Sequence, residues 1–170
     1  MKKILLVLLA FCIALPSFGQ KLSKEEREAA AKAANTAALD AVKAKAFVLV
    51  PTTYTEDAAE GTISDNTDNS NFFSCEGENC FAQGVICCDN RYTNICEPTE
   101  YSMNIDKKGN MKLRIVVSGR MLKGTYTFSM RHNTNHADVI FSPQNGTTRK
   151  FSGPIVPLKE ANYNKRSNPM

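Results

Sequence analysis

Residues 111–117 read Met-Lys-Leu-Arg-Ile-Val-Val, and apolar and basic side chains alternate along the first five of them. A period of two places Met111, Leu113 and Ile115 on one face of an extended strand and the two basic residues on the other. The stretch therefore predicts a half-buried β-strand that turns one face toward a core.

The same alternation marks strands on both sides of this stretch. Their apolar positions are Tyr101, Met103, Ile105, Tyr126, Phe128, Met130, Ala137, Val139 and Phe141, and Phe151 and Ile155 close the series. Short turns join these strands, at 106–110 with Gly109 supplying a positive φ, and at 145–146 with an Asn-Gly pair. Strands joined in this way are antiparallel neighbours, which predicts a meander. Since a flat meander would leave one apolar face bare, we expect a sandwich or a small barrel-like sheet.

An N-terminal helix precedes the strands. Ser23 and Glu26 stand three residues apart, as the two partners of a capping box do. Residues 24–45 are mostly Ala, Lys and Glu, which favour helices. We expect the first half of this helix to be solvated and the region around Val42 to dock on the sheet. The predicted fold class is thus mainly β, with an N-terminal α-helix.

The first residues have the three parts of a secretory signal peptide. Residues 1–3 supply a positive start, residues 4–15 are an apolar run, and Ser17 and Gly19 are small residues before a cut that would leave Gln20 first. The apolar run is too short to span a hydrocarbon core of ~30 Å as an anchor. We expect cleavage between Gly19 and Gln20, export to the periplasm or the extracellular space, and no stable membrane span afterwards.

These features divide the chain into four parts. Residues 1–19 are the expected signal peptide, 20–46 the N-terminal helix, 47–160 the antiparallel β domain, and 161–170 a loose polar tail. Within the β domain, residues 52–70 are rich in Thr, Asp, Asn, Glu and Gly, and we expect a long polar connection there with one short strand.

The charge balance argues against a nucleic-acid partner. The formal net charge is +4, and cleavage would remove Lys2 and Lys3, so that 19 basic residues face 17 acidic ones. The charges are segregated: residues 52–106 carry eleven acidic residues and one basic residue, and residues 107–170 carry twelve basic and two acidic residues. We expect the two halves to pair in one sheet and neutralise each other. The alternative is a basic surface for an anionic partner.

Three segments in a fixed order resemble a known family. The first segment, residues 71–83, has the pattern of a strand, a turn with Gly and acidic residues, and a second strand that carries the Ala-Gln pair at 82–83. The second segment is the turn at 106–110, and the third is residues 151–158. Together they resemble the domain-of-unknown-function family 4251, secreted proteins of Gram-negative gut anaerobes, over residues 39–165. The resemblance implies a signal peptide, an N-terminal helix and a mainly antiparallel β domain. It implies no established activity and no catalytic residues.

Five cysteines remain after cleavage: Cys75, Cys80, Cys87, Cys88 and Cys96. In an exported chain they predict disulfides. Cys75 and Cys80 flank four residues and would face each other across a hairpin, and Cys96 would then pair with Cys87 or Cys88. Two bridges allow fifteen arrangements, from five choices of the odd cysteine and three pairings each, and the sequence does not select one. The odd thiol could be buried and inert, bonded to another chain, or reactive.

No other motif identifies a chemistry. The four, six, zero and seven residues between successive cysteines lack the two-residue spacing of zinc knuckles. His132 and His136 bracket a predicted turn and are expected to be exposed. The chain has no Gly-x-Ser-x-Gly elbow, no dinucleotide fingerprint and no phosphate-binding loop. We therefore assign no catalytic, cofactor-binding or metal-binding residue, although a triad or a carboxylate pair assembled in space stays open.

These patterns favour a non-enzymatic binding or structural module of the cell envelope, with a protein or a small ligand as partner. The alternative is a hydrolase or a thiol-dependent enzyme, which would gather ionisable groups in a concave pocket.

Overall fold

The structure is a computed structural model that describes residues 22–56, 59–62, 69–87 and 92–167. The predicted signal peptide, with Gly19 and Gln20, lies outside these residues. The elements in chain order are α1 (Lys24–Lys43), β1 (Ala46–Leu49), β2 (Thr53–Glu56), β3 (Ala59–Thr62), β4 (Phe72–Glu76), β5 (Asn79–Gln83), the 3-10 helix η1 (Gly84–Ile86), β6 (Asn94–Ile105), β7 (Met111–Gly119), β8 (Lys123–Met130), β9 (His136–Pro143) and β10 (Arg149–Pro157).

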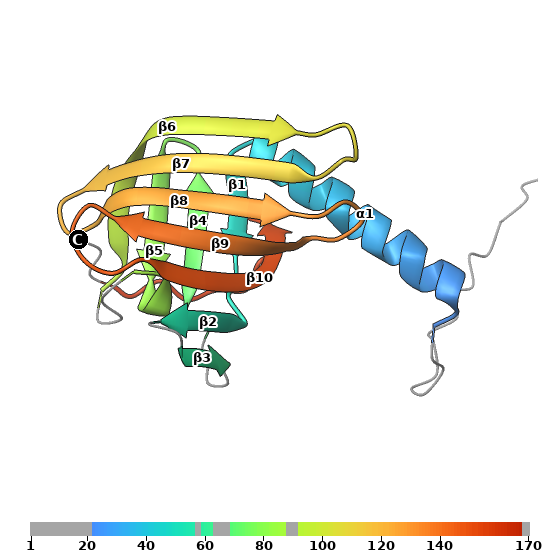
Figure 1. Cartoon of the computed structure of the whole chain (residues 1–170), viewed down its shortest axis with the longest axis horizontal. Helices are drawn as coiled ribbons and strands as arrows, with labels where there is room; N and C mark the ends of the chain where they lie inside the picture. Colours follow the sequence, from blue (N-terminus) through green and yellow to red (C-terminus); the bar gives the residue numbers. More distant parts are fainter. Residues whose placement is uncertain (1–21, 57–58, 63–68, 88–91, 168–170) are drawn as a thin grey trace, which may run out of the picture.

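Eight of the described strands close into an antiparallel barrel (Figure 1). Their order is β1-β4-β5-β6-β7-β8-β9-β10, and β10 pairs with β1 to complete the ring. The closing pairs are Phe47 with Pro157, Val48 with Val156 and Leu49 with Ile155. The predicted mainly β fold with an antiparallel meander is confirmed, and the sheet takes the barrel form of the two expected arrangements.

The seam of the barrel, where β10 pairs with β1 and β2, depends on a glycine. β1 and β2 lie in line along β10, and between them the Val50 amide donates to the Pro154 carbonyl at 3.1 Å. A Cβ atom at Gly153 would collide with the Val50 carbonyl oxygen, so a side chain there would force the seam apart. Beyond the seam, β2 pairs with β3 as a two-stranded extension of the barrel sheet. The sequence instead predicted a mostly irregular connection in this region.

Side chains fill the inside of the barrel. All five residues chosen from the sequence alternation are buried, with exposed fractions of 0–1%: Met111, Leu113, Ile115, Tyr126 and Phe128. The Tyr126 ring stacks on Phe141 with 4.3 Å between centroids and contacts Phe73 at 4.4 Å. An eight-stranded barrel is just wide enough for side chains to fill it or for one small ligand to bind, and here aromatic rings occupy the space.

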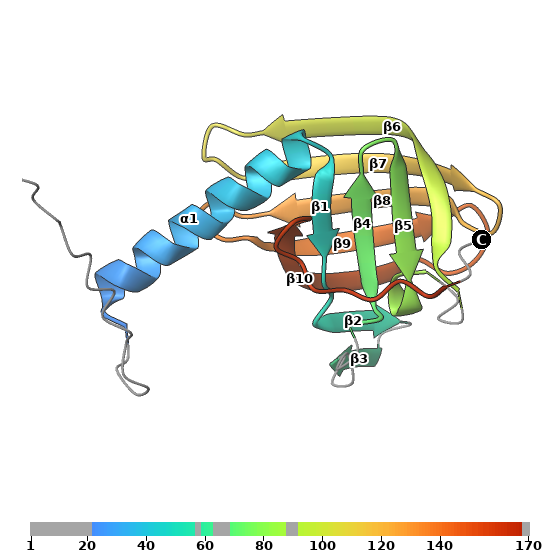
Figure 2. The same ribbon diagram turned by 180° about the vertical axis from the view of Figure 1, so that it is seen from behind.

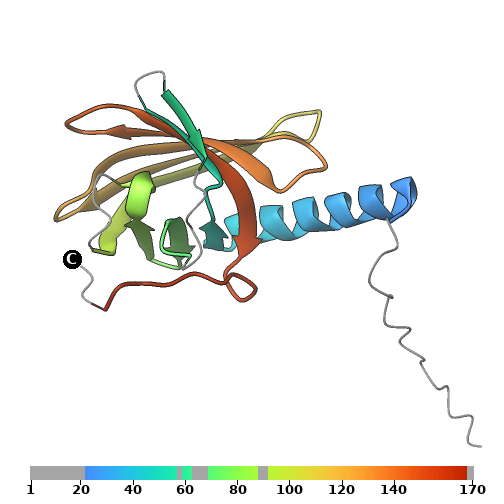
Figure 3. The same cartoon turned by 90° about the horizontal axis from the view of Figure 1, so that it is seen from below.

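Helix α1 covers one end of the barrel, and its first half stands away from it (Figure 3). The predicted capping box is present, since Glu26 N–H donates to Ser23 Oγ and Ser23 N–H donates to Glu26. Val42 is buried, and the Tyr101 hydroxyl donates to its carbonyl at 2.5 Å. The Asn35 side-chain amide donates to a carbonyl of the β8–β9 turn at 2.6 Å. The second half of the helix is thus attached by both apolar and polar contacts.

The short helix η1 closes the opposite end. Ile86 is fully buried there, and the Tyr126 hydroxyl donates to its carbonyl oxygen at 3.0 Å. This hydrogen bond joins η1 to the aromatic core of the barrel. Among the described residues, no helix is sufficiently long and apolar to cross a membrane.

Candidate functional site

A pocket of about 550 Å³ lies beside η1 at this end of the barrel, and we name it the mouth pocket. Its lining combines the cations Arg120 and Lys123, the apolar side chains Met121, Leu122 and Pro143, the polar side chains Tyr92, Asn94, Gln144 and Asn145, and the thiol of Cys87. Ligand pockets usually have volumes of about 300–1,000 Å³ and combine apolar walls with a few polar groups. The mouth pocket matches this description.

Backbone hydrogen bonds fix the main chain that carries the two cationic residues. The β7–β8 turn is closed by a bond from Gly119 N–H to the Leu122 carbonyl at 2.8 Å, and Arg120 lies in this turn. Gln144 N–H donates to the Lys123 carbonyl at 2.8 Å, which joins the end of β9 to the start of β8. Arg120 therefore lies in a turn that a hydrogen bond closes, and Lys123 lies at the start of a paired strand.

The pocket favours an anionic group next to an apolar one. Arg120 and Lys123 supply two positive charges, and the lining residues that the structure describes include no carboxylate. Leu122 is buried behind them, whereas Met121 keeps 65% of its surface exposed. An exposed methionine beside a cation offers an adaptable apolar contact to a ligand.

Cys87 forms part of the pocket floor. Its thiol donates to the Gly84 carbonyl at 3.5 Å, and the Asn94 side-chain amide donates to its sulfur at 3.2 Å. Cys87 is 1% exposed, so the thiol is almost fully covered by protein atoms.

The other described cysteines lie inside the barrel. Cys80 stands opposite Cys75 across β4 and β5, as the predicted hairpin requires, and opposite Cys96 across β5 and β6. All four described cysteines are buried, and Cys88 lies outside the described residues. Burial raises the pKa of Cys75, as do a hydrogen bond and the charge of Cys80, and burial likewise raises the pKa of Cys96. The predicted disulfides stay a prediction.

The histidines lie away from the mouth pocket. His132 and His136 are exposed at the two ends of the β8–β9 turn, as predicted. In the described part of the chain, no three His, Cys, Asp or Glu side chains are grouped so that they could hold a metal ion.

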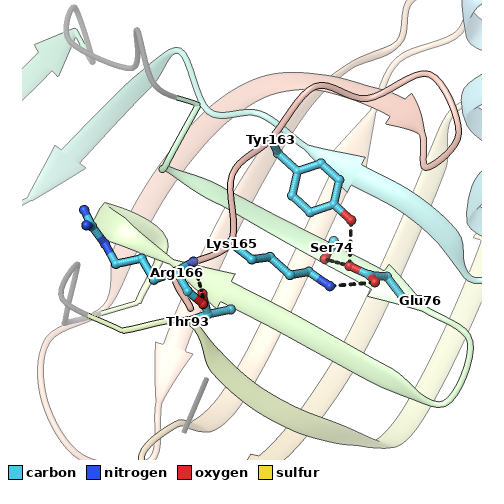
Figure 4. Close-up of polar contacts among 6 residues, drawn as sticks. All are labelled: Ser74, Glu76, Thr93, Tyr163, Lys165 and Arg166. Atoms are coloured by element: carbon cyan, nitrogen blue, oxygen red, sulfur yellow. Dashed lines mark hydrogen bonds and ion pairs between the residues drawn. The ribbon is translucent and has the colours of Figure 1, made fainter. Parts of the chain in front are cut away.

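A second polar cluster lies on the outside of the barrel, where residues 163–166 cross the outer face of β4 and β5 (Figure 2). We name these residues the strap. Glu76 at the end of β4 accepts hydrogen bonds from Ser74 Oγ at 2.7 Å, Tyr163 Oη at 2.9 Å and Lys165 Nζ at 2.7 Å (Figure 4). The Tyr163 ring also packs edge-on against Phe72.

The strap changes the titration of the residues that it touches. Burial alone would raise the pKa of Glu76, but hydrogen bonds from Lys165, Ser74 and Tyr163, together with the Lys165 charge, hold it below its ordinary value. The pKa of Tyr163 is raised, first by burial and then by its bond to Glu76. The carboxylate is therefore stabilised in its charged form by the folded strap.

A buried glutamine binds the backbone of the strap. The Gln83 amide donates to the Asn164 carbonyl at 3.0 Å, and its oxygen accepts from Arg166 N–H at 3.0 Å. Thr93 Oγ1 accepts a further bond from Arg166 N–H at 2.9 Å. We expected a loose tail over 161–170, and these bonds correct that expectation for 163–166. Individual hydrogen bonds to side chains of the barrel attach this polar segment. Its sequence therefore needs no hydrophobic periodicity and shows none.

A groove of about 540 Å³ lies between α1 and the end of β10. Four alanines line it, with Pro157 and Leu158 on the other wall. It offers fewer side-chain hydrogen-bonding groups than the mouth pocket.

Sequence reasoning singled out Glu76 and Gln83 only as parts of a pattern, and it missed Arg120 and Lys123. Nothing in the local sequence distinguishes these cations from other exposed basic residues. Their proximity to residues 143–145 follows from the pairing of β8 with β9.

The crystal structure of a DUF4251 family protein from Bacteroides eggerthii DSM 20697 is similar to this chain. The TM-score is 0.68 at 23% sequence identity, and the match covers 79% of this chain and 95% of that one. The two proteins share a fold. The fold expected from the resemblance to family 4251 is thus confirmed. No protein-family model and no curated protein matches the chain.

Proposed function

We propose that this chain is an exported, non-enzymatic binding module of the cell envelope, and that its mouth pocket holds a small ligand with an anionic group and an apolar body. Export is supported by the signal-peptide pattern before Gln20. The intact mass of exported protein tests this part: it should correspond to a chain that begins at Gln20, and a mass that includes Met1 would contradict it.

The observation that carries the binding proposal is the lining of the mouth pocket. Aromatic side chains fill the barrel, and the mouth pocket offers a ligand a site with both polar and apolar walls. There, Arg120 and Lys123 face the same space as Leu122 and Pro143. A ligand that presents a carboxylate, sulfonate or phosphate to the cations and an apolar surface to the wall would satisfy both.

The ionic part of this binding can be measured with two probes that share a ring system. The anionic probe is 1-anilinonaphthalene-8-sulfonate, and the neutral probe is N-phenyl-1-naphthylamine. Each exposed cation at about 4 Å from the sulfonate contributes about 1 kcal/mol in water. The double substitution Arg120→Gln and Lys123→Gln should therefore weaken binding of the anionic probe by about 30-fold, and binding of the neutral probe by much less.

The matched control removes two charges from the opposite end of the barrel, by Lys107→Gln and Lys108→Gln, both exposed in the β6–β7 turn. This control should leave the affinity for both probes unchanged. Equal affinity of the pocket variant and the unmodified protein for the anionic probe would overturn the proposal. An equal loss of affinity in the control would also overturn it, because it would show a general effect of net charge.

A further inference from the structure

Four polar residues form one row across the outer face of the barrel. Asn104 of β6 stands directly opposite Lys112 of β7. Ser129 of β8 stands opposite Lys112 on one side and opposite Asp138 of β9 on the other. All four residues are exposed, and no described helix or strand crosses the outer face of β6–β9, which is turned toward the viewer in Figure 1. Since neighbouring strands lie about 4.7–4.9 Å apart, the row is about 14 Å long.

The row lies along a groove of about 500 Å³, which we name the outer groove. The other residues of its lining belong to the adjoining turns or are buried: Asp106, Asn110, Arg131, Met111 and Met130. His132 N–H donates to Asn110 Oδ1 at 3.0 Å and thereby joins the β6–β7 turn to the β8–β9 turn. The two turns at this end of the groove are therefore held together.

Most hydrogen-bonding side chains of the outer groove are free for a ligand. Asp106 is engaged, since it accepts from Lys108 N–H, Asn110 N–H and the Asn110 side-chain amide. Within the described part of the chain, the side chains of the row and of Arg131 make no hydrogen bond or ion pair. Their ammonium and guanidinium groups donate, the carboxylate accepts, and the amide and the hydroxyl do both. The groove can thus satisfy a ligand that is rich in donors and acceptors.

The free charges of the groove favour an acidic ligand. Lys112 and Arg131 are cationic, and Asp138 is the one unengaged carboxylate among the described lining residues. Asp138 lies two strands away from Lys112, a separation of about 10 Å, and no ion pair neutralises the two charges. A ligand can therefore place a carboxylate at the cations and a hydroxyl group at Asp138.

The groove suits neither an added strand nor an apolar body. Each of the strands β6–β9 pairs with a strand on both sides, so the main-chain groups of this face are already used. Met111 and Met130, the apolar residues of the lining, are only 1% and 2% exposed. Recognition must come from polar side chains, and saccharides present many hydroxyl groups on an extended body.

We propose that the outer groove binds an acidic oligosaccharide. A uronate carboxylate lies at Lys112 and Arg131, and sugar hydroxyl groups bond to Asn104, Ser129 and Asp138. The outer groove and the mouth pocket share no lining residue. Failure of one site to bind its ligand therefore leaves the other proposal standing.

Two probes separate saccharide recognition from charge attraction. Trigalacturonate carries three carboxylates and several hydroxyl groups, whereas a triglutamate peptide blocked at both ends carries three carboxylates and no hydroxyl group. In an amide NMR titration, trigalacturonate should cause its largest shift changes in residues 104–112, 129–131 and 138. Triglutamate should bind at least about 5-fold more weakly, the equivalent of one net hydrogen bond. Equal affinity for both probes, or largest shift changes at the mouth pocket, would overturn the proposal.

Substitutions in the groove test the named contacts. Each exposed cation at about 4 Å from a carboxylate contributes about 5-fold in water, so Lys112→Gln with Arg131→Gln should weaken trigalacturonate binding by about 30-fold. Asn104→Ala should weaken it by about 5-fold with no change of charge.

The matched control is Lys24→Gln with Lys159→Gln. It removes two charges from side chains that are 85% and 83% exposed and do not line the groove. This control should keep the affinity of the unmodified protein for trigalacturonate. Unchanged affinity in the groove variants would overturn the proposal, and so would an equal loss in the control.

Discussion

Replacement of Glu76 by glutamine should weaken the attachment of the strap while leaving the barrel intact. The Glu76 carboxylate accepts from Ser74 and Tyr163 on one oxygen and from Lys165 on the other. Glutamine keeps the size of the side chain and one acceptor oxygen. It removes the charge and the acceptor that faces the Lys165 ammonium group.

The expected cost follows from the partial exposure of this ion pair. The Lys165 and Glu76 side chains are 32% and 21% exposed. Hydrogen bonds to charged groups contribute about 1.5–3 kcal/mol, and solvent-exposed ion pairs contribute about 0–1 kcal/mol. For this intermediate case we expect Glu76→Gln to lower the free energy of unfolding by about 1–2 kcal/mol at neutral pH.

The cost should depend on pH. In the folded protein the pKa of Glu76 lies below its ordinary value of 4.5, because the hydrogen bonds to the carboxylate outweigh burial. A lowered pKa means that the charged form stabilises the fold fully above the unfolded pKa, and that this contribution disappears as the pH falls through the folded pKa. The difference between the unmodified protein and the variant should therefore be complete at neutral pH and vanish in acid.

Urea denaturation followed by circular dichroism, at neutral and acidic pH, measures both effects. The matched control is Glu78→Gln, the same change at an exposed residue of the adjacent turn, which should alter stability by less than about 0.5 kcal/mol. An equal cost for both variants at neutral pH, or a cost of Glu76→Gln that persists undiminished in acid, would refute the reasoning.

Three further substitutions test other contacts. Gly153→Ala places a Cβ atom against the Val50 carbonyl oxygen at the seam and should cost about 1–3 kcal/mol in urea denaturation; an unchanged midpoint would contradict the close approach. Tyr126→Phe removes the bond to the Ile86 carbonyl and should cost about 1 kcal/mol, with faster hydrogen exchange around η1 as the specific readout. Asn35→Ala removes the bond from α1 to the β8–β9 turn and should cost about 1 kcal/mol, with faster amide exchange in α1 than in the barrel.

The sequence predicted the features that depend on nearby residues, namely the strands, their inward face and the start of the helix. The alternation around Leu113 and Phe128 identified the strands and their inward face, because half-buried strands must repeat with a period of two. The capping box located the start of α1 because its two bonds are local. Barrel closure was different: it depends on β1 pairing with β10, two segments far apart in the chain, so periodicity could not distinguish a barrel from a sandwich.

The mouth pocket and the strap illustrate a second limit of prediction from sequence, because residues far apart in the chain form both. The mouth pocket combines Arg120 and Lys123 with residues from β9 and β6, and only the register of the sheet brings them together. The strap is attached through Glu76 and Gln83, which pair with individual atoms of a polar segment. Such contacts leave no repeating pattern in the sequence, which is why residues 163–166 were expected to be loose.

Two ion pairs agree in part with the expectation that the acidic and basic halves of the chain neutralise each other's charge. Glu100 and Arg114 form an ion pair across β6 and β7, and Glu76 and Lys165 form another between β4 and the strap. Both pairs join an acidic residue of the first half to a basic residue of the second. Arg120 and Lys123, by contrast, line the mouth pocket.

The most direct test of ligand binding at the mouth of a filled barrel is a backbone amide NMR titration with 1-anilinonaphthalene-8-sulfonate. The predicted result is that the largest shift changes fall in residues 119–124 and 143–145, which surround Arg120 and Lys123. Largest changes in residues 37–46 and 157–160, around the groove between α1 and β10, would contradict the mouth pocket as the binding site.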